Sequence, residues 1–159
     1  MKTYQKLLGA SCLALYLVGC GSGGESPVEM IANSESEFQI SSKADSVTIQ
    51  GVKLNRGNCV VNFVPAVMEA AEIVFLNQIV TPISMQDFKD MASIYKEFNQ
   101  KEWVANMENK ISQLKQKGVM MESQTLKFGE SLKGFSQGCN IIEAIIQTDK
   151  GTWTFNFDR

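Results

Sequence analysis

Hydrophobic positions between residues 84 and 117 recur with the period of a helix. A first apolar set is spaced every three or four positions and comprises Phe88, Met91, Tyr95 and Phe98. A second set with similar spacing comprises Trp103, Met107, Ile111 and Leu114. At 100° per residue the two stripes are offset by roughly 150°, so one straight helix cannot bury both against one core. We therefore predict helical structure with a break or sharp bend near Asn99 and Gln100.

The ends of this helical region carry start and stop signals. Ser84 stands three residues before Asp87, as in a capping box, and Gly118 follows the last apolar position. The methionines of this part of the chain are Met85, Met91, Met107, Met120 and Met121. Because methionine is flexible and polarisable, they either fill the core or line an adaptable binding groove.

Alternating patterns on both sides of the helical region predict β-strands. Residues 46–54 alternate, and the phase changes at Gly51, which indicates a β-bulge. After turn-forming residues at 55–58, residues 59–64 are apolar and β-branched, which predicts a hairpin. Towards the C-terminus we expect a short strand at 125–128, a loop at 129–138, a central strand at 140–147 and an alternating strand at 152–157.

Residues 65–80 are open to two interpretations. Pro65 can begin a helix, and the mostly apolar stretch that follows predicts a buried helix, with a second hairpin as the alternative. Glu69 and Glu72 exclude a membrane span. Strands, then helices, then strands predict an α+β fold: a small single domain in which two to three helices lie on one face of an antiparallel sheet formed by the N-terminal hairpin and the C-terminal strands.

The N-terminus has the layout of a secretory signal peptide. Lys2 and Lys6 precede an apolar run at residues 7–18, which is shorter than the roughly 20 residues needed to span a bilayer. The run ends in Leu17-Val18-Gly19-Cys20, which resembles the lipobox of bacterial lipoproteins.

This resemblance implies a complete set of processing steps. Signal peptidase II would remove residues 1–19, and Cys20 would become the lipidated N-terminus that holds the protein on a membrane without a spanning helix. Lipoproteins kept in the inner membrane tend to have Asp after the lipidated Cys; Gly21 stands there, so the resemblance implies a periplasm-facing anchor in the outer membrane.

Residues 20–46 are rich in Gly, Ser and Glu and predict a flexible tether to a globular domain at 47–159. The alternative is that Phe38 and Ile40 pair as an edge strand or docking segment. Residues 21–46 hold five acidic side chains and one lysine, whereas residues 47–159 hold 12 basic and 12 acidic side chains. A neutral domain with no clustered basic residues does not favour nucleic acid as a partner.

The proposed processing determines which cysteines remain available for a disulfide. Cys12 would leave with the signal peptide and Cys20 would carry lipid, which leaves Cys59 and Cys139 in an oxidising compartment. We expect these two to form one disulfide. A loop of about 80 residues closed in this way would stabilise the fold by roughly 4.5 kcal/mol on the chain-entropy model.

Candidate catalytic chemistry is sparse. The chain has no histidine, which excludes Ser-His and Cys-His nucleophile pairs and histidine-ligated zinc. Glu143 is the one carboxylate in an otherwise apolar strand, and we expect it to face solvent or an edge. We predict a non-enzymatic protein with no cofactor and no metal.

Two functions remain open at this point. The first is an envelope lipoprotein that binds a protein partner, in assembly, secretion, conjugation, exclusion or enzyme inhibition, through a patch around Trp103 and Met107. Core packing is the alternative role of Trp103. The second function is a small periplasmic hydrolase or ligand carrier acting on cell-wall or lipid material.

Overall fold

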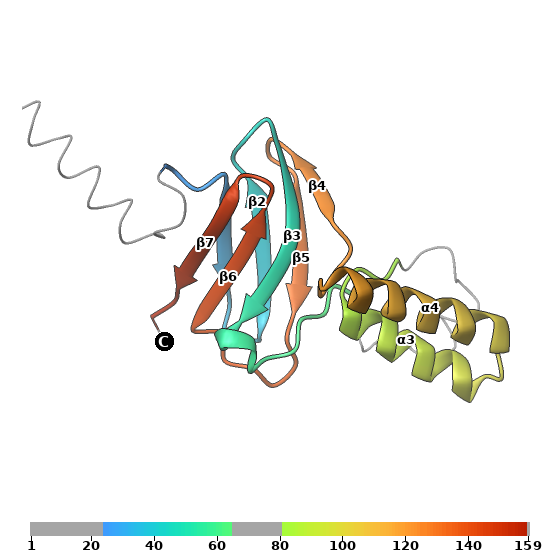
Figure 1. Ribbon diagram of the computed structural model, residues 1–159. Coiled ribbons are helices and arrows are strands. Elements are labelled where there is room, and N and C mark those ends of the chain that lie inside the picture. The colour runs from blue at the N-terminus through green and yellow to red at the C-terminus, as the bar shows by residue number, and fades with distance from the viewer. Residues whose placement is uncertain (1–23, 65–80, 159) are drawn as a thin grey trace, which may run out of the picture.

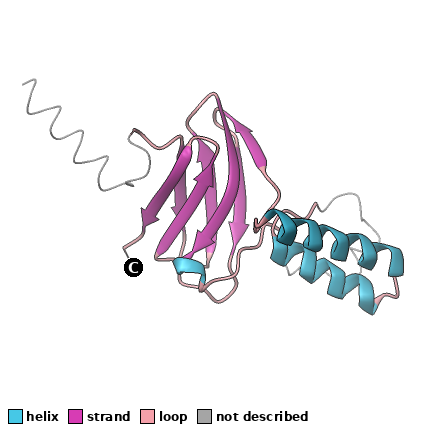
Figure 2. Cartoon of the chain, viewed as in Figure 1, coloured by secondary structure: helices cyan, strands magenta, loops and turns pink. Residues whose placement is uncertain are grey.

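The structure is a computed structural model that describes residues 24–64 and 81–158. Two antiparallel sheets pack face to face, and a pair of helices projects from one side of them, beside β4 and β5 (Figures 1 and 2). The three-stranded sheet has the order β1-β2-β5 and comprises β1 (Val28–Ala32), β2 (Glu37–Ser42) and β5 (Ser131–Phe135). The four-stranded sheet has the order β4-β3-β6-β7 and comprises β4 (Gln124–Lys127), β3 (Ser46–Leu54), β6 (Glu143–Thr148) and β7 (Gly151–Asn156). Within these residues the helices are α3 (Met85–Glu97) and α4 (Lys101–Lys117), and a 3-10 turn, η1 (Asn55–Gly57), follows β3.

This architecture confirms the expected α+β class, with two antiparallel sheets, two helices and a disulfide between Cys59 and Cys139. The two sheets share one core because alternate side chains of each strand point between them. The three-stranded sheet contributes Val28, Met30, Phe38 and Ile40 to this core. The four-stranded sheet contributes Val47, Ile49, Val52, Leu54, Leu126, Ala144, Ile146, Trp153 and Phe155.

The prediction of a flexible tether over residues 20–46 is wrong for residues 28–42, which form β1 and β2. Strand β2 lies between β1 and β5, with Phe38 opposite Gly134 and Ile40 opposite Leu132. The alternative reading of Phe38 and Ile40 as strand residues was closer, although β2 is a central strand. Most polar residues of β1 and β2 face outwards, although Ser42 is buried, and ordered structure begins well before residue 47.

Three other expectations need correction. Residues 59–64 do not form the second strand of a hairpin; they make isolated bridges, from Cys59 to Leu54 and from Asn62 to Phe135. The expected loop at 129–138 contains β5. The helices do not cover a sheet face but project beyond the sandwich (Figure 1). The helix or hairpin predicted for residues 65–80 lies outside the described residues.

The local predictions for the strands are confirmed in two places. The pairing of β3 with β6 shifts between Ile49 and Gly51, which is the predicted bulge. Strand β6 lies between β3 and β7, so it is a central strand of its sheet.

The helical hairpin follows its sequence signals closely. Ser84 and Asp87 form a reciprocal capping box, and Gly118 ends α4 in the left-handed conformation with φ 69°. The predicted break lies at residues 98–100, where Asn99 has φ 56°. Because the chain reverses there, the two apolar stripes face each other and form a second core, separate from that of the sandwich.

Candidate functional site

A single buried carboxylate joins the helical hairpin to the sandwich. Asp87, on the first turn of α3, accepts hydrogen bonds from the backbone N–H groups of Ile83 and Ser84 at 3.1 and 2.9 Å. It also accepts from the backbone N–H groups of Phe63 and Val64, at 3.0 and 3.2 Å. One side chain therefore fixes the start of α3 and the segment that leaves the sandwich.

Asn62 extends this connection to the three-stranded sheet. Its side-chain amide donates to Asp87 at 3.2 Å and to Asp90 at 3.0 Å. Its backbone exchanges two hydrogen bonds with Phe135 at the end of β5, at 3.0 and 2.8 Å. The segment that follows α4 is attached as well, because Met85 N donates to Met120 O at 2.8 Å. The hairpin is thus held at its base by both segments that link it to the sandwich.

The disulfide lies at this same end of the sandwich. The Cα atoms of Cys59 and Cys139 are 6.0 Å apart, and the bridge confirms the predicted pairing. The amide of Asn55 donates to Asn140 O at 2.8 Å, and its side-chain oxygen accepts from Ile142 N and Glu143 N, at 2.9 and 3.1 Å. The disulfide and Asn55 together fasten η1 to the loop between β5 and β6.

A groove of about 210 Å³ lies between the sandwich and the base of the hairpin, and we call it the junction groove. Its lining comes from β3 and the following segment (Val52, Lys53, Gly57, Cys59, Val60, Val61) and from the hairpin base (Ser84, Met85, Gln86, Lys89, Met120, Met121). Val60 and Met120 are 50% and 61% exposed. The charged residues in this lining are Lys53 and Lys89, so the groove combines exposed apolar side chains with a basic rim.

The methionines divide between the two roles predicted for them. Met91 and Met107 are buried in the hairpin core. Met85 and Met121 are buried at the wall of the junction groove, whereas Met120 is exposed within it. The methionine pattern therefore indicated part of this groove from the sequence. Nothing in the sequence singled out Val60, which is one residue of an apolar run.

A second depression, of about 440 Å³, lies at the three-stranded sheet. Its lining comes from β1 and β2 (Ile31, Ala32, Asn33, Glu37, Phe38, Gln39), from β5 (Lys133, Gly134, Phe135) and from Phe63. Ile31 is exposed here, but the polar groups have mixed charge. Asn33 is engaged in the turn between β1 and β2, because its side chain accepts from Glu35 N and Glu37 N and donates to the Glu37 carboxylate.

The patch proposed around Trp103 and Met107 is not an unpartnered surface. Met107 is buried, and Trp103 is partly buried with its ring stacked on Tyr95 at a centroid distance of 5.6 Å. These contacts favour the alternative of core packing for Trp103, because the turn at Asn99 brings the second helix back onto the first. Burial of Tyr95 in this interface raises the pKa of its hydroxyl above 10.0.

The remaining candidate residues are placed as follows. Glu143 is the first residue of the central strand β6 and is partly buried, so it lies at a strand end and not on an edge strand or facing solvent as expected. Its carboxylate forms an ion pair with the exposed Arg56 at 3.5 Å. Within residues 24–64 and 81–158, no group of three or more acidic or sulfur side chains could hold a metal ion. No described helix is long and apolar enough to cross a membrane. Cys20 lies outside the described residues.

The chain matches no known protein family, and neither the curated proteins nor the solved structures include a significant match to it.

Proposed function

We propose that this protein is an outer-membrane lipoprotein that binds a protein partner through the junction groove. The observation that carries this proposal is the exposure of Val60 and Met120 in one groove between the sandwich and the base of the hairpin. Apolar side chains that line a concave surface and are rimmed by polar groups are typical of protein interaction sites.

The rim of the groove indicates the chemistry of the partner. Lys53 and Lys89 are both exposed lining residues. A partner that inserts an apolar side chain between Val60 and Met120 and places carboxylates on either side would satisfy both features. The mature globule is otherwise nearly neutral, so this local charge would guide orientation more than long-range attraction.

The position of the groove supports a role at a membrane surface. It lies at the Leu54 end of β3, whereas the chain enters the fold at the opposite end of the sandwich, beside Ser46 (Figure 1). An anchor on Cys20 would therefore leave the groove accessible to proteins of the periplasm.

Site-specific photo-crosslinking in native membranes tests the groove. A photoreactive amino acid in place of Met120 should form an adduct with one defined protein, and the double change Lys53→Glu and Lys89→Glu should abolish it. The control is the same photoreactive group in place of Ile31, which is exposed on the other sheet. Equal adducts from both positions, or adducts that survive the charge reversal, would contradict the proposal.

Lipidation is tested separately. The wild-type protein should incorporate labelled palmitate and sediment with outer membranes, and Cys20→Ala should abolish the labelling. Recovery of unlabelled wild-type protein in the soluble fraction would contradict the lipidation proposal without bearing on the groove.

One observation favours the alternative function of a ligand carrier. The depression at the three-stranded sheet has a volume within the range of small-molecule sites and combines Ile31 and Phe135 with the side chains of Glu37 and Lys133. Binding of cell-wall fragments or lipids that shifts the NMR signals of Phe135 and leaves those of Met120 unchanged would favour this function.

A further inference from the structure

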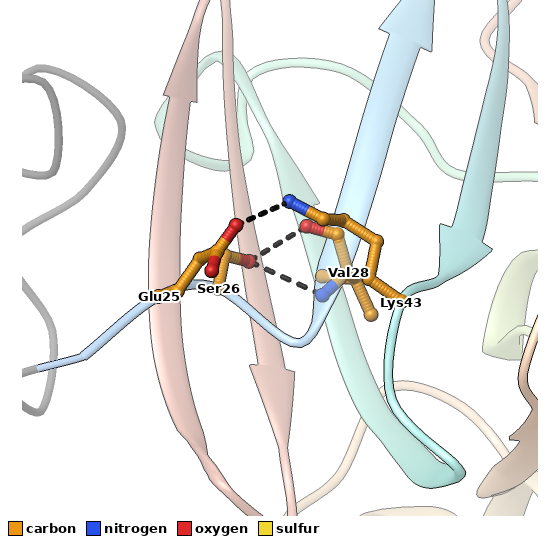
Figure 3. Close-up of polar contacts among 4 residues, drawn as sticks. All are labelled: Glu25, Ser26, Val28 and Lys43. Carbon is orange, nitrogen blue, oxygen red and sulfur yellow. Dashed lines mark hydrogen bonds and ion pairs between the residues drawn. The ribbon is translucent and has the colours of Figure 1, made fainter.

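The structure fixes the chain very close to the residue that we propose is lipidated. Ser26 is buried, and its hydroxyl donates to Val28 O at 2.7 Å and accepts from Val28 N at 3.3 Å (Figure 3). Lys43 N donates to Pro27 O at 2.8 Å, and the Lys43 ammonium pairs with the Glu25 carboxylate at 3.0 Å. The N-terminal segment is therefore part of the fold from Glu25 onwards.

The distance from Cys20 to this point is short. Five residues lie between Cys20 and the fixed Glu25 when the latter is counted, and fully extended chain covers about 18 Å over five residues. If Cys20 carries the acyl chains, as proposed above, the end of the sandwich that holds Glu25 must lie within that distance of the lipid headgroups. The opposite end, with the disulfide and the junction groove, then faces away from the membrane.

This end of the sandwich carries an exposed aromatic side chain. Phe128 is 71% exposed and occupies the turn between β4 and β5. Glu130 N donates to Lys127 O at 2.9 Å, which closes the turn, and Gly129 has φ 81°, as the third position of a type II turn requires. A turn of this kind places the side chain of its second residue outwards, and it has no need of an aromatic residue there.

The turn is tied to the point where the chain enters the fold. Gly129 N donates to Ser42 O at 3.0 Å, and Phe128 N donates to Asp45 O at 3.3 Å. Between these two acceptors lies Lys43, which pairs with Glu25. Phe128 is therefore held beside the chain that leads to Cys20 by contacts of the backbone.

We propose that Phe128 inserts into the headgroup region of the leaflet that holds the acyl chains of Cys20, and that it fixes the orientation of the domain on the membrane. An aromatic ring is favourable at the boundary between headgroups and hydrocarbon. The ionisable residues of this turn and of the chain tied to it have both signs, namely Glu25, Lys43, Asp45, Lys127 and Glu130. The contact is therefore apolar rather than an electrostatic attraction to anionic lipid.

Quenching by brominated phospholipids tests this orientation. The lipidated full-length product is reconstituted into vesicles of phosphatidylethanolamine and phosphatidylglycerol, with either Phe128→Trp or Ile142→Trp. Ile142 is the matched control, because it is an exposed apolar residue at the opposite end of the sandwich. Lipids brominated near the headgroup should quench most of the emission added by Phe128→Trp and little of that added by Ile142→Trp.

The outcomes separate this inference from the proposed lipidation. Vesicle flotation reports attachment independently of quenching. Protein that floats without quenching of the Phe128→Trp emission, or with equal quenching at both positions, overturns the orientation and leaves lipidation intact. Protein that does not float at all contradicts lipidation itself, and the orientation falls with it.

Discussion

At the scale of single residues, Asp87 joins the start of α3 to the segment that leaves the sandwich. Its two carboxylate oxygens accept from five N–H groups, four of the backbone and one of Asn62. Hydrogen bonds to a charged group are stronger than those between neutral groups, and loss of the acceptor leaves buried donors unpaired. A residue that reads in the sequence as a helix cap therefore also determines where the hairpin is attached.

We expect Asp87→Ala to lower the free energy of unfolding by about 3 kcal/mol. Asp90→Ala is the matched control on the same helix, because Asp90 accepts only side-chain amides, from Asn62 and Gln86, at 3.0 and 2.8 Å. Its cost should be about 1 kcal/mol. Urea denaturation with the disulfide intact measures both values, and equal losses would contradict the role given to Asp87.

Gly134 is a second position where one residue type fits. A Cβ atom at this position would lie 2.3 Å from Phe38 Cζ and 2.8 Å from Asn62 O. Phe38 is a core residue and Asn62 O accepts the β5 bridge from Phe135 N, so neither can move freely.

We therefore expect Gly134→Ala to destabilise the fold by about 2 kcal/mol. The control is Gly51→Ala, whose Cβ would meet the side chain of the exposed Gln147, which can rotate away. Thermal unfolding should show a clear fall in the midpoint for Gly134→Ala and a smaller change for Gly51→Ala. A harmless Gly134→Ala would mean that β5 shifts easily relative to β2.

At the scale of elements, the helical hairpin has its own core, and the ionisation of the buried Tyr95 hydroxyl should make its stability depend on pH. Burial raises the pKa of Tyr95, so the folded state holds the hydroxyl proton more tightly than the unfolded state does. The stabilisation is complete below pH 10.0, the usual value of the group, and it is lost as the pH rises through the raised value.

The free energy of unfolding should therefore fall with increasing pH above 10.0, and Tyr95→Phe should flatten that part of the profile. Phenylalanine retains the stacking on Trp103 and lacks the ionisable hydroxyl. Denaturant titrations at several alkaline pH values compare the two proteins. A Tyr95→Phe profile as steep as that of the wild type would assign the loss to other groups, such as the lysines.

The elements that the sequence predicted best have strong local signals. The break near Asn99 followed from the offset of two apolar stripes, and the bulge at Gly51 followed from a change of phase. Strands β1 and β2 were missed because most of their outward positions are polar and the surrounding sequence is rich in Gly, Ser and Glu. Strand β1 pairs with β2, and β2 pairs with β5, about 90 residues away along the chain, which no local pattern reports.

The candidate site was harder to predict than the fold. The junction groove joins Val60 to Met120, which are far apart in the sequence and meet only because the hairpin returns to its own base. Trp103 was a reasonable candidate while the helices were considered separately, but its neighbour in space is Tyr95. A groove that is lined by two distant segments can be identified only once the path of the chain is known.

At the scale of the whole molecule, the two ends of the sandwich differ. One end holds the entry of the chain and Phe128, and the other holds the disulfide and the base of the hairpin. If the first end lies at a membrane, the second presents the junction groove to the periplasm. The disulfide therefore stabilises the part of the molecule that would meet a partner.

The double change Cys59→Ser and Cys139→Ser tests that role. The bridge spans 80 positions of sequence, so its loss should lower the free energy of unfolding by roughly 4.5 kcal/mol on the chain-entropy model. The unfolded chain would also become more expanded, so the dependence of stability on urea concentration should become steeper. Cys59 also lines the groove, and its sulfur accepts a hydrogen bond from the Asn55 amide at 3.3 Å. The photo-crosslink from position 120 should therefore weaken at urea concentrations that leave the wild-type crosslink unaffected. An unchanged unfolding midpoint would show that the hydrogen bonds of Asn55 are enough to hold this end of the sandwich together.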